Sequence, residues 1–472
     1  MPLHLPASRR LAVLVAAVVA LATSAGGARE PRPDGSPVNV VLILADDLGY
    51  GEVGYQGQKL HRTPNLDRLS AEGIRFSQHY AGSAVCAPSR CTLLTGRHTG
   101  HARIRDNVGL GPQGEEVRPA LQPGDVTVAD VFRRAGYATG CFGKWGQGDE
   151  DTPGVPWLHG FDQFFGFLHN THGTRYYTEF IYRNAEKVAL RGNYGRWRKQ
   201  YSPELIFNEA VRFLEQNRDR PFFLYYPFNL VHGDFIAPPA ESDDPPPPAG
   251  VTLSEKERNY LAMVRRMDRD VGRLVARIDA LGLGEKTLIL FASDNGAKGL
   301  GEPNDALLAA SGGFRGGKAD LYEGGIRVPM FARWKGAIAP GRTTDLPSAF
   351  WDFLPTVCAL IGQPAPAGID GESYLPTLLD QPQPERRSAF YWELAKRDEP
   401  QVVPKQAVRS GPWKLLLTGD RPPELYRIDA DPHETRDLAA EQPAEVARLR
   451  GLLASSRTDD PLFPLKPGPG FE

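Results

Sequence analysis

Two pairs of polar residues follow apolar runs and could bind a metal ion. Asp46 and Asp47 come after the run 38–44, and Asp294 and Asn295 come after the run 287–292. Three carboxylates and an amide carbonyl are hard oxygen ligands, which suit calcium or magnesium better than zinc. Each pair alone is also an ordinary turn signal. Two such pairs, each at the end of a predicted strand, favour a metal site.

A second stretch that could carry out chemistry begins at Cys86. It reads Cys86-Ala87-Pro88-Ser89-Arg90 and continues to Arg97. A thiolate at Cys86 could act as a nucleophile, with the Arg90 guanidinium lowering the pKa of the thiol. The structural alternative is a small buried cysteine that precedes a helix. The residues alone leave both readings open.

The elements that must position these residues alternate between strands and helices. Helical periodicity extends from a Ser254/Glu257 capping box to Leu281, and shorter helices are expected at 205–214 and 128–135. This alternation predicts a large, mostly parallel sheet sandwiched by helices, with ligands bound beyond the carboxyl ends of the strands. The expected strands are 38–44, 137–142, 221–226 and 287–292.

Proline-rich segments divide the rest of the chain. Residues 238–250 are expected to form neither helix nor central strand, and a surface loop is favoured over a pocket border. Residues 362–384 join a second, smaller α+β unit. That unit contains an expected antiparallel pairing of 407–418 with 424–431, and a closing helix at 441–455.

Composition and the N-terminus restrict the class of protein. The chain has 472 residues with 55 Lys+Arg against 57 Asp+Glu, which argues against a dedicated nucleic-acid binder. Residues 1–28 have the pattern of a secretory signal peptide, and their apolar run is too short to span a bilayer. We therefore expect export to the periplasm or medium, no membrane span in the mature protein, a catalytic domain at 29–375 and a C-terminal subdomain at 385–472. Four cysteines are too few for a disulfide scaffold, and the pairing of Cys91, Cys141 and Cys358 stays open.

The stretch around Cys86 resembles the signature of type I sulfatases, C-x-P-S-R followed by x-x-L-L-T-G-R. Further segments of the chain resemble that family in the family's order, over nearly the whole mature length. They are Asp46-Asp47, 136–139 with Gly143-Lys144-Trp145, Ser293-Asp294-Asn295-Gly296, 316–318 with 322–329, and, in the tail, 424–426, 431–432 and 437–439.

The resemblance implies a fold like alkaline phosphatase with a small C-terminal antiparallel sheet domain. It implies that Cys86 is oxidised to formylglycine by a formylglycine-generating enzyme and hydrated to a geminal diol. One hydroxyl of the diol attacks the sulfur of a sulfate monoester, and the other helps to eliminate sulfate. The implied roles are calcium binding for Asp46, Asp47, Asp294 and Asn295, sulfate binding for Lys144 and Lys318, contact with the formylglycine for Arg90, and protonation of the leaving oxygen for His232.

The chain departs from the family pattern at Gly146. The family commonly has Gly-Lys-Trp-His, and that histidine is credited as the base in sulfate elimination. Here Gly146 stands in its place, so either the base is His172, His169, Asp47 or a water molecule, or turnover is expected to be slow. His172 is equally expected as a substrate contact. His232 also lies in Val-His-Gly-Asp, where relatives often have Pro-His-x-Pro.

The residues and the resemblance together predict a calcium-dependent formylglycine sulfatase. We expect the substrate to be a sulfated sugar or polysaccharide, with aryl sulfates as test substrates. The alternatives are a phosphomonoester hydrolase of the same superfamily and a non-catalytic relative that binds sulfated glycans. The basic and aromatic run 191–199 could contact an anionic glycan, although a solvated loop is favoured there.

Overall fold

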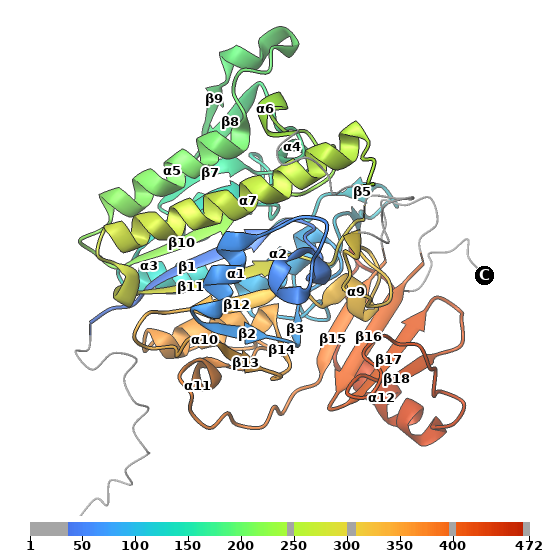
Figure 1. The fold of residues 1–472 in the computed structure, drawn as a ribbon. Helices are drawn as coiled ribbons and strands as arrows, with labels where there is room; N and C mark the ends of the chain where they lie inside the picture. Colours follow the sequence, from blue (N-terminus) through green and yellow to red (C-terminus); the bar gives the residue numbers. More distant parts are fainter. Residues whose placement is uncertain (1–35, 243–249, 300–307, 396–402, 466–472) are drawn as a thin grey trace, which may run out of the picture.

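A ten-stranded sheet forms the centre of the structure, a computed structural model that describes residues 36–242, 250–299, 308–395 and 403–465 (Figure 1). Its strand order is β13-β2-β12-β11-β1-β10-β6-β7-β8-β9. The strands are β1 (Asn39–Ala45), β2 (Ile74–Phe76), β6 (Ala138–Lys144), β7 (Gln163–Phe167), β8 (Phe180–Arg183), β9 (Glu186–Ala189), β10 (Phe222–Pro227), β11 (Thr287–Ser293), β12 (Met330–Arg333) and β13 (Arg342–Thr344).

The four strands expected from the apolar runs are neighbours at the centre of this sheet. β11, β1, β10 and β6 pair in parallel, and Leu42 lies opposite both Tyr225 and Leu290. All four strands are buried along their whole length. That burial explains why they are continuous apolar runs, without the alternation of a half-exposed strand. The predicted strands are confirmed, with bounds shifted by one or two residues.

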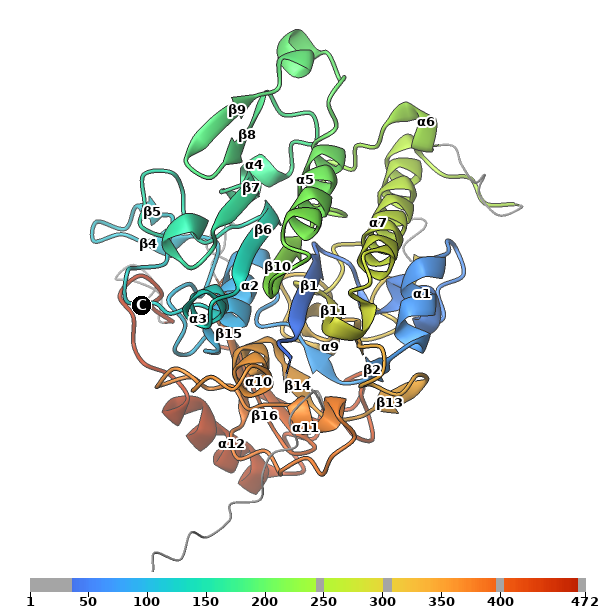
Figure 2. The same cartoon turned by 90° about the vertical axis from the view of Figure 1, so that its left-hand side faces the viewer.

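Helices cover both faces of the sheet (Figure 2). Val41 and Ile43 of β1 contribute to one core with α1, α5 and α7, whereas Val40 and Leu42 contribute to the opposite core with α2, α3 and α10. The Ser254 and Glu257 capping box begins α7 as predicted. The helices are α1 (Pro64–Ala71), α5 (Ser202–Gln216) and α7 (Glu255–Ala280) on one face, and α2 (Cys86–Thr95), α3 (Val128–Arg134) and α10 (Phe353–Leu360) on the other.

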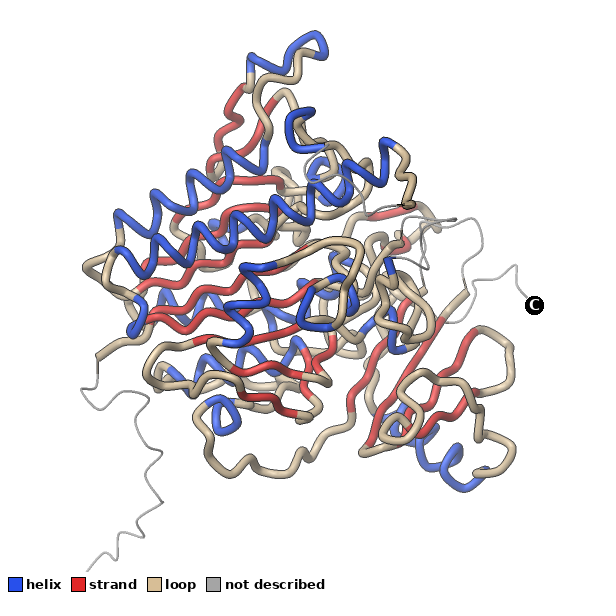
Figure 3. Tube along the Cα trace, in the orientation of Figure 1, coloured by secondary structure: helices blue, strands red, loops and turns tan. Residues whose placement is uncertain are grey.

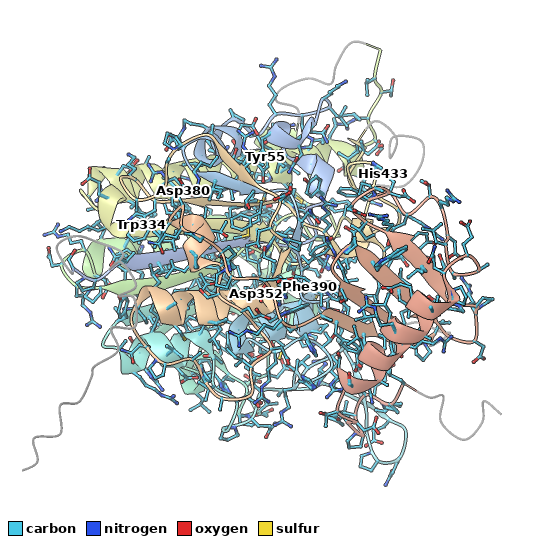
Figure 4. The ribbon with its side chains drawn as sticks, turned by 90° about the horizontal axis from the view of Figure 1, so that it is seen from below. Tyr55, Trp334, Asp352, Asp380, Phe390 and His433 are labelled. Carbon is cyan, nitrogen blue, oxygen red and sulfur yellow. The ribbon has the colours of Figure 1, made fainter. Side chains whose placement is uncertain are left out.

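The C-terminal unit is a four-stranded antiparallel sheet beside the large sheet (Figure 3). It consists of β15 (Phe390–Leu394), β16 (Lys405–Ser410), β17 (Trp413–Thr418) and β18 (Glu424–Arg427), with α12 (Pro443–Ser455) against it. The expected antiparallel pairing of 407–418 with 424–431 is confirmed for β17 and β18. Residues 407–418 do not form one continuous strand, because Gly411, at φ +58°, and Pro412 turn the chain into a hairpin of β16 and β17. Figure 4 shows Asp352 and Phe390 close together at the junction with the large domain, where Arg386 contacts both side chains.

A second correction concerns the proline-rich segment 238–250. Pro239–Ser242 forms one helical turn, α6, since proline is tolerated in the first turn of a helix. Residues 243–249 and the expected signal peptide 1–28 lie outside the described residues. No described helix is both long and apolar enough to cross a membrane. The remaining short elements include β3 (His79–Tyr80), β4 (Gly109–Leu110), β5 (Glu116–Val117), β14 (Ser348–Ala349), α4 (Asn170–Gly173), α9 (Glu323–Ile326) and α11 (Leu375–Leu378).

Candidate active site

The two polar pairs meet where neighbouring parallel strands end. Asp46 and Asp47 follow β1, and Asp294 and Asn295 follow β11, its partner in the sheet. The Asp47 amide donates to Asp294 Oδ1 at 3.0 Å, and Asn295 Nδ2 donates to Asp47 Oδ1 at 2.8 Å. All four side chains are buried. The structure thus brings the predicted metal ligands together in the interior.

Three cationic side chains neutralise these carboxylates. Lys144 Nζ lies 2.6 Å from Asp46 Oδ2, and Lys318 Nζ lies 2.6 Å from Asp47 Oδ2. Arg90 donates through Nε and Nη2 to Asp294 Oδ2 at 3.0 and 2.8 Å, and through Nη1 to the Lys144 carbonyl. Its role implied by the family was contact with residue 86, but its hydrogen bonds here tie α2 to the ends of β11 and β6.

Burial raises the pKa of both Asp46 and Asp294, but the net shifts of the two groups have opposite directions. Burial alone disfavours an ionised Asp46, but Lys144, His232 and Arg90 outweigh it and hold the pKa of Asp46 below its usual range. At Asp294, burial and the nearby Asp46 charge outweigh Arg90 and raise the pKa to about 6. Three carboxyl groups so close together therefore depend on cations for their charge.

The donor atoms of this cluster fit a hard cation. Asp46 Oδ1 and Asn295 Oδ1 are buried and have no hydrogen-bond partner among the described residues. Unsatisfied buried acceptors are costly and are commonly explained by a bound ion or water molecule. Asp46, Asp47 and His232 each offer a ligand atom within 4.8 Å of the other two. Oxygen donors outnumber the one imidazole, so calcium fits this set better than zinc.

Cys86 is the first residue of α2 and is 2% exposed. Its thiol donates to Asn107 Oδ1 at 3.7 Å, and the Ala87 amide donates to the same oxygen at 3.2 Å. Burial raises the pKa of the thiol despite the charges of Lys144 and Lys318. A thiolate nucleophile activated by Arg90 is therefore poorly supported. Sequence reasoning missed Asn107, because it lies in none of the recognised motifs.

His232 reaches the cluster through the loop after β10. The Asp46 amide donates to the Leu230 carbonyl at 2.8 Å, and the Val231 amide donates to the Asp46 carbonyl at 2.8 Å. These bonds place His232 Nε2 3.6 Å from Asp47 Oδ2. Burial lowers the pKa of His232 to about 4, with Asp47 acting in the opposite direction. The imidazole retains 18% side-chain exposure, so it sits at the edge of the buried cluster.

The position that lacks the family histidine has a defined structure. Gly146 has φ +77°, and an ideal Cβ on it would lie 2.4 Å from Asn170 Oδ1. That oxygen is buried and without a partner in the described structure. Gly146 and Asn170 line a cavity of about 20 Å³ together with Ala87, Asn107 and His169. The side-chain amide of Asn170, from α4, therefore occupies the space that the Cβ atom of a larger residue at position 146 would need.

Neither alternative histidine is arranged as a base in this structure. His169 Nδ1 accepts from the Thr171 amide at 3.1 Å, which leaves the ring proton of the neutral imidazole on Nε2. His172 Nε2 lies 2.7 Å from Thr178 Oγ1, whose hydroxyl donates to the Phe180 carbonyl, so His172 is the donor of that pair. The His172 ring packs against Phe167 and Phe180. Within the described residues, no hydrogen bond or ion pair joins His172 to the clustered site residues, and its role stays a prediction. The clustered residues are Asp46, Asp47, Cys86, Arg90, Lys144, His232, Asp294, Asn295 and Lys318.

The open question about the cysteines has a structural answer. All four are in the described part of the chain, buried and free of disulfides. Cys91, Cys141 and Cys358 act as small apolar residues of the core under α2, α3 and α10.

Comparisons with known proteins agree with this arrangement. Residues 38–363 match the sulfatase family, and residues 316–456 match the family described as N-sulphoglucosamine sulphohydrolase, C-terminal. Steryl-sulfatase of Mus musculus is 30% identical over 91% of this chain and 84% of its own. The N-acetylgalactosamine-6-O-sulfatase of Bacteroides thetaiotaomicron is 29% identical over 89% and 93%. The crystal structure of Ps i-CgsB in complex with k-i-k-neocarrahexaose superposes with a TM-score of 0.75 at 26% identity, covering 90% of this chain and 94% of that one.

A large mixed sheet with an acidic and cationic site at its strand ends, followed by an antiparallel C-terminal sheet, is the sulfatase fold. The chain belongs to the sulfatase family and is a hydrolase of sulfate esters. The family resemblance and the expected fold class are confirmed.

Proposed function

We propose that this chain is a calcium-binding sulfatase whose nucleophile is a formylglycine formed from Cys86, and that it hydrolyses sulfate esters of sugars. The convergence of Cys86, Lys144, Lys318 and His232 on the buried carboxylate cluster carries the proposal. A sulfate ester presents an anionic group and an alcohol leaving group. The site offers cations for the first and an imidazole for the second.

Asp46, Asp47, Asp294 and Asn295 would hold the calcium ion. Asp46 Oδ1 and Asn295 Oδ1 support this assignment, because both oxygens are buried and no described protein group satisfies them. When bound, the ion would add positive charge opposite the sulfate oxygens as negative charge develops on them. Lys144 and Lys318 would then be free to turn from Asp46 and Asp47 toward the sulfate.

The residues around Cys86 would position a modified side chain. A hydrated formylglycine would supply a hydroxyl group that attacks sulfur, so that a difficult hydrolysis is divided into two easier steps. Asn107 Oδ1, which already contacts residues 86 and 87, would accept a hydrogen bond from such a hydroxyl. His232, at the exposed edge of the cluster, would protonate the departing alcohol oxygen.

The sugar substrate rests on the named ligands of relatives. One relative is named for N-acetylgalactosamine 6-O-sulfate, and one similar structure holds a neocarrahexaose. Another is named for steryl sulfate, so steroid sulfates belong in the same assay. We further propose that residues 1–28 direct export.

The test begins with protein produced alongside a formylglycine-generating enzyme. Mass spectrometry of the tryptic peptide 76–90 should show oxygen in place of sulfur at residue 86. The preparation should hydrolyse an aryl sulfate and at least one sulfated sugar, and a chelator should abolish turnover until calcium is returned. Cys86→Ala is the matched control for background activity.

Four outcomes would contradict parts of this proposal. An unmodified thiol in fully active protein would contradict the formylglycine nucleophile. Full activity after chelation would contradict the requirement for calcium. Turnover of phosphate monoesters in preference to sulfates would favour a phosphohydrolase. Binding of sulfated glycans without any turnover of modified protein would identify a non-catalytic relative.

A further inference from the structure

A basic and aromatic surface lies on the segment that connects β9 to α5. Trp197 is 63% exposed and Tyr194 is 47% exposed, which makes them two of the three large apolar side chains with high exposure in the described residues. Figure 1 shows that this segment forms the end of the molecule beyond β8 and β9. We name the surface formed by Arg175, Tyr177, Tyr194, Trp197, Arg198 and Lys199 the basic–aromatic strip.

The strip is held in place by a buried asparagine. Asn193 Nδ2 donates to the carbonyls of Thr178 and Gln200 at 2.7 and 2.8 Å, and its Oδ1 accepts from the amides of Lys199 and Gln200 at 3.1 and 2.9 Å. Thr178 is in turn the partner of His172. Such internal hydrogen bonds distinguish the segment from a loosely solvated loop. His172 is therefore linked to the strip by hydrogen bonds through Thr178 and Asn193.

The cations of the strip form no ion pair with a described carboxylate. Residues 190–200 include four basic residues and no acidic one. No ion pair within the described ranges joins Arg175, Arg198 or Lys199 to a carboxylate, and the nearby Glu241 is already paired with Arg266. The cations lie on aromatic rings instead: Lys199 Nζ is 4.5 Å from the Trp197 centroid, and Arg198 Cζ is 5.9 Å from that of Tyr177.

The strip is continuous with the sulfate site through residues 173–177. Gly173 lies against the aliphatic part of Lys144, since an added Cβ would be 3.2 Å from Lys144 Cδ. The buried Tyr176 hydroxyl donates to the His232 carbonyl at 2.7 Å. Between and beyond these anchored residues, Arg175 is exposed and Tyr177 is half-buried beneath Arg198. Residues 173–177 therefore connect the strip to Lys144 and His232.

We propose that the basic–aromatic strip binds an extended anionic polysaccharide whose terminal or internal sulfate ester enters the site. Sugar rings present flat C–H faces that pack on exposed aromatic rings, and sulfate or carboxylate groups accept hydrogen bonds from Arg and Lys. The proposal rests on the proposed activity toward sulfated sugars, and it specifies a polymer with repeated anionic groups as the substrate class.

Binding is measured first, with turnover removed. The full chain carrying Cys86→Ala is examined by affinity electrophoresis in gels containing a sulfated galactan, a sulfated glycosaminoglycan or uncharged dextran. The sulfated polymers should retard the protein and dextran should not, and added salt should weaken the retardation. Adding Arg198→Ala/Lys199→Ala should weaken binding about five- to thirtyfold, and Trp197→Ala about three- to tenfold.

Arg421→Ala/Arg450→Ala is the matched control, because it removes the same charge from exposed positions on the C-terminal subdomain. This control should retain the affinity of the parent protein. An equal loss in the control would reduce the effect to net charge, and tighter binding of single-stranded DNA than of any sulfated glycan would also overturn the proposal.

Kinetics of the modified enzyme separate this proposal from the proposed activity. Arg198→Ala/Lys199→Ala should raise KM for the sulfated polymer about five- to thirtyfold, while kcat/KM for a small aryl sulfate stays unchanged. If the variant is active and its KM for the polymer is unchanged, the proposed role of the strip is wrong and the proposed sulfatase activity still stands. Polymer binding that depends on the strip, in a protein that hydrolyses no sulfate ester, would retain the strip and reject the activity.

Discussion

Gly146 is expected to resist any side chain, and Asn170 is expected to be the reason. Its φ of +77° costs a residue with a Cβ about 1–2 kcal/mol. The added Cβ would lie 2.4 Å from Asn170 Oδ1, and overpacking of that kind costs about 1–3 kcal/mol. Gly146→Ala should therefore lower the free energy of unfolding by about 2–5 kcal/mol.

Urea unfolding followed by tryptophan fluorescence measures this loss without any need for residue 86 to be modified. Gly136→Ala is the matched control, because Gly136 has φ +83° and an added Cβ would meet nothing within 4 Å. That change should cost only the backbone part, about 1–2 kcal/mol.

Asn170→Ala alone should be nearly neutral, since it removes an oxygen without a described partner. In Gly146→Ala/Asn170→Ala the loss should fall to the level of Gly136→Ala, a coupling of about 1–3 kcal/mol between the two sites. Equal losses in Gly146→Ala and Gly136→Ala, or no relief from Asn170→Ala, would refute the reasoning.

Three further predictions concern the metal, the acid and the domain junction. Removal of calcium by a chelator should lower the melting temperature by about 3–5 °C relative to protein at a hundredfold excess over Kd, and Asp46→Asn should abolish that calcium effect. His232→Gln should reduce kcat/KM for sugar sulfates by about 10²–10⁴ and much less for nitrophenyl sulfate, whose leaving group needs no proton; equal losses would contradict the acid role. Burial and Glu323 raise the pKa of Glu434 from 4.5 to about 7 despite Lys414, which lies 2.9 Å from both carboxylates. The folded state then keeps a proton that the unfolded chain releases, so this contribution to stability is complete below pH 4.5 and is lost as the pH rises to about 7. Glu434→Gln should flatten that part of the pH–stability curve, and an unchanged slope would contradict the assignment.

The sequence predicted the centre of the fold well because buried parallel strands are continuous apolar runs. β1, β10 and β11 have this pattern, and the polar residues at their ends were expected at one edge. Short strands such as β2 and β12 have only three or four residues, and tertiary pairing defines them more than local pattern. The hairpin at Gly411 was missed because apolar residues lie on both sides of the turn.

The site shows the same division between local and distant information. Residue types and positions predicted the metal ligands and Cys86, whereas the family resemblance predicted the two lysines. Asn107 and Asn170 occupy no motif, and only the folded chain places them next to Cys86 and Gly146. The direction of the Arg90 side chain also depends on where β11 ends, which spacing along the chain does not specify.

The contact between Val85 and the C-terminal sheet has a consequence for the order of events during synthesis. Val85 shares a core with Trp392, Leu416 and Tyr426, and Trp392 Nε1 donates to the Ala81 carbonyl. The segment that leads into Cys86 therefore acquires its final cover only after the last strands have left the ribosome. About 340 residues separate Cys86 from the end of β18, which corresponds to roughly 20–70 s of translation. During that interval an enzyme that modifies Cys86 could bind the segment while it is extended. Once the C-terminal sheet has folded, it would block access to this segment.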